Sequence, residues 1–140
     1  MPWGWVIHTQ LALAAEPTSA RTARQFVGEA LTEWGLAHAA ELAILLASEL
    51  VTNAIRHAGT DDILVRLEWA GGTAPVRVEV HDHSPDLPSQ PAAGRRGAEP
   101  DPLALSGRGL ALVEVCADDW GVQVADDGKA VWFELDTGPP

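Results

Sequence analysis

The spacing of apolar positions changes several times along this chain, and each change predicts a helix or a strand. Residues 5–13 are apolar and partly β-branched, which predicts a first strand. From 20 to 34 apolar residues recur every three or four positions, which predicts a helix that ends at Gly35. A second helix, from about 38 to 57, is apolar almost all round, as expected of a helix buried against a sheet.

The second half of the chain is predicted to form mainly strands. Strict alternation of apolar and polar residues predicts strands over 63–69 and 76–81. Two more strands are predicted over 120–125 and 130–135, joined by a turn at 126–129. Adjacent pairs of strands favour an α+β protein over a doubly wound parallel sheet. We therefore expect one domain, residues 1–140, built as a two-layer α/β sandwich with a mixed, mainly antiparallel sheet and helices on one face.

Composition and charge narrow the classes of function. The 140 residues are 46% hydrophobic and 21% charged, as in a folded globular protein. The net charge of -11 disfavours direct binding to nucleic acid or to a membrane surface, because both rely on Lys and Arg neutralising phosphate. A single cysteine, Cys116, fits a cytoplasmic location, and no uncharged apolar run is long enough to predict a transmembrane helix.

The second helix carries the first candidate site. Glu49 and Asn53 are four residues apart and share a face with Leu42 and Leu46. An amide oxygen suits Mg²⁺, and a partly desolvated carboxylate suits a general base. The alternative is a solvated notch in a helix that is less buried than its composition suggests.

Asp82 is the second candidate. It has the same parity as Val76, Val78 and Val80, so its side chain should leave the strand on the core side. A carboxylate in that place is either a structural acid with a partner in the protein or an acceptor for the amino group of a ligand.

The third candidate is the segment 83–106, which contains five prolines and no apolar period and is followed by a short helix over 110–117. Loops of this length often serve as lids or binding loops. Gly107, Arg108 and Gly109 open the helix, whose first N–H groups attract phosphate. Arg95, Arg96 and Arg108 are three of the nine basic residues, so a phosphate site is favoured here, the alternative being a glycine-rich helix start.

Together, the helix with Glu49 and Asn53, the strand that ends in Asp82, the long loop and the glycine-opened helix resemble the GHKL ATPase superfamily, which has the Bergerat ATP-binding fold. The segment 49–57 and the small size are similar to those of anti-sigma-factor serine/threonine kinases and their actinobacterial relatives. The resemblance extends over residues 16–136.

The resemblance implies roles for particular residues. Asn53 would coordinate the Mg²⁺ that bridges the ATP phosphates, Glu49 would be the general base, and Asp82 would accept a hydrogen bond from the adenine amino group. The loop 83–106 would be the ATP lid. Contacts to the nucleotide are expected from Asn53, Arg56, His57, Asp82, Gly107, Arg108, Gly109 and Leu110. For His57, stabilisation of the helix dipole is an equal alternative.

Two positions depart from the family pattern. The usual glycine after the adenine aspartate is replaced, since the sequence continues as His83-Ser84-Pro85. Relatives often have a threonine near the adenine in the last strand, and we expect Ala130 at that place.

The resemblance implies an ATP- and Mg²⁺-binding regulatory protein of the cytoplasm that transfers the γ-phosphoryl group to a Ser or Thr of an antagonist protein. Its partners would be an anti-sigma-factor antagonist, a sigma factor or both, and a homodimer is an option because relatives are often homodimers. Two alternatives stay open. One is a non-catalytic ATP-binding module that sequesters a partner, and the other is a stand-alone histidine-kinase-like ATPase domain.

Overall fold

The computed structural model describes residues 6–58, 62–83 and 106–138. Its elements, in chain order, are β1 (Ile7–Leu13), α1 (Ser19–Glu33), α2 (Ala37–Ala58), β2 (Ile63–Trp69), β3 (Val76–Asp82), α3 (Ser106–Cys116), β4 (Asp119–Ala125) and β5 (Gly128–Leu135).

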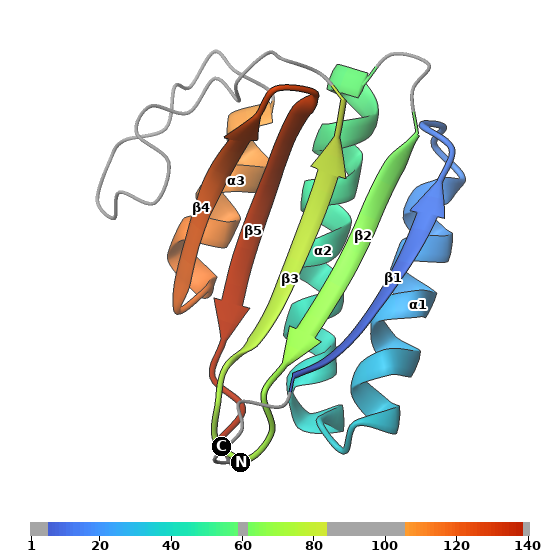
Figure 1. Ribbon diagram of the computed structural model, residues 1–140. Coiled ribbons are helices and arrows are strands. Elements are labelled where there is room, and N and C mark those ends of the chain that lie inside the picture. The colour runs from blue at the N-terminus through green and yellow to red at the C-terminus, as the bar shows by residue number, and fades with distance from the viewer. Residues whose placement is uncertain (1–5, 59–61, 84–105, 139–140) are drawn as a thin grey trace.

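The strands form one sheet in the order β1-β2-β3-β5-β4, and the three helices cover one of its faces (Figure 1). Every strand pair in the described part of the chain is antiparallel. The predicted α+β sandwich with helices on one face is therefore confirmed, and the sheet contains no parallel pair within these residues.

The core lies between the sheet and the central helix α2, which contacts α1, α3 and strands β2, β3 and β5. Alternate residues of the strands point towards it, as the sequence pattern predicted. The largest fully buried side chains include Trp120, Phe133, Leu46, Ile63 and Leu67.

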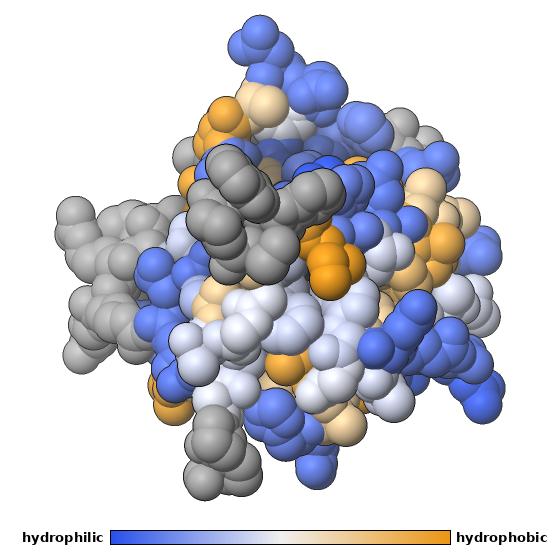
Figure 2. All heavy atoms as spheres, turned by 60° about the horizontal axis from the view of Figure 1, so that its bottom comes forward, coloured by the Kyte–Doolittle hydropathy of each residue, from blue (hydrophilic) through white to orange (hydrophobic). Residues whose placement is uncertain are grey.

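Helix α2 is apolar because it is the core helix. By length and hydropathy alone Ala37–His57 could cross a membrane, but half of this stretch is buried inside the protein. The surface seen from the lower end of Figure 1 is largely hydrophilic, and its apolar residues form small separate patches (Figure 2).

The start of the third helix and the turn between the last two strands differ from the sequence prediction. The third helix begins at Ser106, so Gly107-Arg108-Gly109 forms part of its first turn and does not precede it. The hairpin between β4 and β5 has a two-residue turn, Asp126-Asp127, because Ala125 pairs with Gly128. As a result Lys129 belongs to strand β5. The predicted lid lies outside the described residues, apart from its ends.

The face of the sheet away from the helices carries a charged cluster at its centre. Arg77 Nε lies 2.6 Å from Glu79 Oε2, and His81 Nε2 lies 2.8 Å from Glu79 Oε1. Arg77 also approaches Glu134 at 3.5 Å and stacks on Trp132, with its Cζ atom 4.0 Å from the ring centroid. The hydrogen bond from His81, together with the hydrogen bond and charge of Arg77, outweighs burial and lowers the pKa of Glu79 to about 2.

Candidate functional site

Helix α2 presents Asn53 and His57 to the sheet. They lie four residues apart and therefore share a face of the helix. Asn53 is 8% exposed, and both residues line a cavity between α2 and the sheet. Glu49, one turn earlier, is half-buried and does not line this cavity, and Arg56 is exposed. The structure thus groups Asn53 with His57, while Glu49 lies beside the cavity along the helix.

Asp82 enters the same cavity from strand β3. Val76, Val78, Val80 and Asp82 are all buried, so the predicted parity is correct and the carboxylate faces the helical layer. Only 3% of the Asp82 side chain is exposed. A carboxylate buried to this extent requires a partner, because desolvation of an isolated charge is costly.

Lys129 of strand β5 is that partner. Its Nζ atom donates a hydrogen bond to Asp82 Oδ1 at 3.0 Å, and the two residues are directly opposite in the β3–β5 register. The Lys129 side chain is 4% exposed. Gly128 allows the close approach of the two strands: its φ is +151°, and a Cβ atom there would collide with the Asp82 carbonyl oxygen. Of the two alternatives for Asp82, the structure therefore shows an acid with a protein partner.

The cavity between α2 and the sheet is small. It has a volume of about 10 Å³, and its wall consists of Leu50, Asn53, Ala54, His57, Val80, Asp82, Lys129 and Val131. This is roughly the space that one water molecule needs. The donor set fits an adenine nucleotide with Mg²⁺, since it offers a buried carboxylate for an amino group and an amide oxygen for a hard cation. The volume of the cavity does not admit a base.

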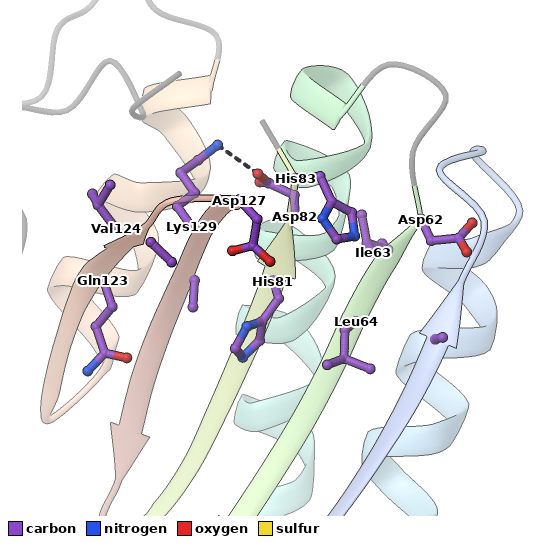
Figure 3. A pocket seen from close by; sticks show the side chains of 13 residues that line it. Asp62, Ile63, Leu64, His81, Asp82, His83, Gln123, Val124, Asp127 and Lys129 are labelled. Atoms are coloured by element: carbon purple, nitrogen blue, oxygen red, sulfur yellow. Dashed lines mark hydrogen bonds and ion pairs between the residues drawn. The ribbon is translucent and has the colours of Figure 1, made fainter. Parts of the chain in front are cut away.

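Ala130 is not in the position that we expected from the resemblance. Adjacent strand residues point to opposite faces, so Ala130 lies on the uncovered face, and Lys129 takes the place next to Asp82. A hollow of about 600 Å³ is present on that face, lined among others by Ala130, His81, Gln123 and Leu64 (Figure 3). Figure 3 marks the Lys129–Asp82 pair with a dashed line at the ends of the two strands. Asp82 and Lys129 border both cavities.

The predicted phosphate segment is described only as backbone. Gly107, Arg108 and Gly109 lie in the first turn of α3, where backbone N–H groups are free of intrahelical bonds. Leu110 is completely buried in the core, so a contact from it to a nucleotide would have to come from its backbone. Arg95 and Arg96 lie outside the described residues.

Sequence reasoning missed Lys129, although the pattern contained a signal for it. Lys129 shares its parity with Val131, Phe133 and Leu135, all three of which are buried in the core. The turn signal over 126–129 places Lys129 in the hairpin turn, whereas the observed turn has two residues and Lys129 is the second residue of β5. The period-2 pattern, extended back by one step, would have placed Lys129 on the helix-facing side.

These features define a class of protein. A two-layer α+β sandwich, with an asparagine on the central helix and an aspartate at the end of an adjacent strand, is typical of ATP-binding domains of the histidine-kinase type. A family model of the histidine kinase-like ATPase domain matches residues 13–135. The chain belongs to this family.

A solved structure has the same fold. The structure of the RsbU and RsbW domains of Rv1364c from Mycobacterium tuberculosis superposes with a TM-score of 0.66 and 22% sequence identity. The match covers 96% of this chain and 33% of that chain, so this protein corresponds to about one third of the length of that protein. Among curated proteins no match was found.

Proposed function

We propose that this protein is an ATP- and Mg²⁺-binding regulatory kinase of the anti-sigma-factor type, acting in the cytoplasm on a Ser or Thr of an antagonist protein. The observation that supports the proposal is the convergence of Asn53, His57 and Asp82 on one cavity between α2 and the sheet. The family membership and the RsbW-like fold of the solved structure agree with it.

Each residue has a role that suits its position. Asp82 accepts a hydrogen bond from the base, Asn53 holds Mg²⁺, and the first turn of α3 presents N–H groups to the phosphates. Bound Mg²⁺ neutralises charge on the phosphates. Glu49 takes the proton from the acceptor hydroxyl, and its half-buried position beside the cavity leaves it open to a protein substrate. Phosphoryl transfer depends mainly on positioning and charge neutralisation, so a few groups suffice.

The substitution Glu49→Ala tests this assignment. We expect the variant to bind ATP as the wild type does and to lose phosphoryl transfer to a candidate antagonist, measured with labelled ATP. Glu41→Ala is a matched control, since Glu41 is exposed on the same helix. Normal transfer by the Glu49 variant would refute the role of general base.

A second candidate function is supported by the Asp82–Lys129 pair. Because the proposed base acceptor has an internal partner and the cavity beside it is too small for a base, a module that sequesters its partner without catalysis is a real alternative. The labelling experiment separates the candidates. Labelled Ser or Thr indicates a kinase, a stable complex without label indicates sequestration, and labelled His indicates a histidine-kinase-like ATPase domain.

A further inference from the structure

Lys129 is unusual in this chain both in its residue type and in its burial. It is the only lysine of the sequence, and the other eight basic residues are arginines. Lysines are almost never fully buried unless they are paired. Here the single lysine is 4% exposed and its partner is the residue that we assign to the nucleotide base.

The ammonium group occupies the hydrogen-bonding position that an amino group of a base would take. Lys129 Nζ donates to Asp82 Oδ1 at 3.0 Å, and an exocyclic amine would donate to the same carboxylate. Asp82 lines the cavity beside α2 together with Lys129, so both donors would compete for the same carboxylate there. Lys129 therefore satisfies Asp82 in the way that a ligand would.

The stem of Lys129 also takes up space. The cavity that it lines lies between Val80 and Val131 on the sheet and Leu50 and Ala54 on α2, and only about 10 Å³ remains free. Ligand pockets have volumes of about 300–1,000 Å³. The cavity is therefore too small for a base, and the lysine stem is part of its wall.

We propose that Lys129 is an internal competitor of the nucleotide base, such that its ammonium group and the base occupy Asp82 in mutually exclusive states. This inference rests on the proposed function, because it takes Asp82 as the base acceptor. Nucleotide binding then requires the ammonium group to leave Asp82 and return to water. Only molecules in which the lysine is displaced can bind the base. The observed affinity is therefore the intrinsic affinity multiplied by the fraction of such molecules. Lys129 thus sets the affinity of the site for nucleotide.

Chemical labelling of the wild-type protein tests the exclusion directly. Reductive methylation modifies accessible amines, and with a single lysine only Lys129 and the N-terminal amine can react. We expect Lys129 to be protected without nucleotide and methylated at saturating ATP and Mg²⁺, with the N-terminal amine as the internal reference. Equal methylation of Lys129 with and without bound ATP would overturn the proposal, whether the lysine reacts in both states or is protected in both.

A set of variants tests the effect on affinity by calorimetric titration with ATP and Mg²⁺. Lys129→Ala should bind ATP about tenfold or more tightly than the wild type. The gain should disappear in the double variant Lys129→Ala/Asp82→Asn, since it depends on the Asp82 carboxylate. Arg66→Ala removes the same charge from the uncovered face and should leave ATP affinity unchanged.

The outcomes separate this inference from the proposed function. If both proteins bind ATP and Lys129→Ala binds it no more tightly than the wild type, Lys129 is not a competitor. Circular dichroism must then show that the variant is folded. The proposed function still stands in that case. If neither protein binds millimolar ATP, the proposed function itself is wrong. Should Lys129→Ala fail to fold, the labelling of the wild-type protein still decides the question.

Discussion

The cluster around Glu79 predicts a specific pH dependence of stability. The pKa of this carboxyl falls from 4.5 to about 2 on folding, chiefly through the hydrogen bond from His81 and then through Arg77. At about 1.36 kcal/mol per pKa unit, the ionised carboxylate contributes about 3 kcal/mol to folding. Because the folded-state pKa is the lower one, this contribution is fully present above pH 4.5 and is lost as the pH falls towards 2.

The assay is urea unfolding followed by tryptophan fluorescence, applied to the wild type and to Glu79→Gln. We expect the variant to be less stable by about 3 kcal/mol at pH 7 and by about half of that at pH 3. Glu68→Gln is the control on the same face: Glu68 and its partner Arg66 are each 30% exposed, so the effect should be about 0–1 kcal/mol. A Glu79→Gln difference that is equal at the two pH values would refute the reasoning.

Further predictions concern packing, backbone and metal binding. Leu46→Ala should destabilise by about 2–5 kcal/mol in urea unfolding because Leu46 is completely buried, while its neighbour Leu45, 45% exposed, should tolerate alanine at a cost of about 0.5 kcal/mol. Gly128→Ala should cost about 1–3 kcal/mol or more, since the added Cβ would collide with the β3 backbone, whereas Gly72→Asn, at φ +58° in open space, should unfold at nearly the wild-type urea concentration. Asn53→Ala should abolish the Mg²⁺ dependence of ATP binding in calorimetry, and an unchanged Mg²⁺ dependence would remove Asn53 as the metal ligand.

Much of the fold could be predicted from the period of the apolar residues. Strands β2 and β3 were predicted to within one residue, because strict alternation over 63–69 and 76–82 has no helical counterpart. The core helix α2 was predicted as well, because a helix that is apolar almost all round is expected to be buried against a sheet. The predicted start of α3 at residue 110 was wrong, since the helix begins at Ser106, because glycines are weak signals of where a helix begins.

The candidate site was predictable in part. The parity of Asp82 with three valines placed it on the helix-facing side. Helical spacing grouped Asn53 with Glu49, whereas the structure groups Asn53 with His57 on the cavity wall. Local patterns of this kind depend only on residues near in sequence, so the sequence alone determined them.

The partner of Asp82 was decided by tertiary structure alone. Asp82 and Lys129 are 47 positions apart, and they meet because β3 pairs with β5 in a register in which the two residues are opposite. That register depends on a two-residue turn and on Gly128, which lets the strands approach where any side chain would collide. The sequence by itself therefore determined the family, the layers and the faces of the elements. The contact between Asp82 and the chain's one lysine follows only from strand pairing.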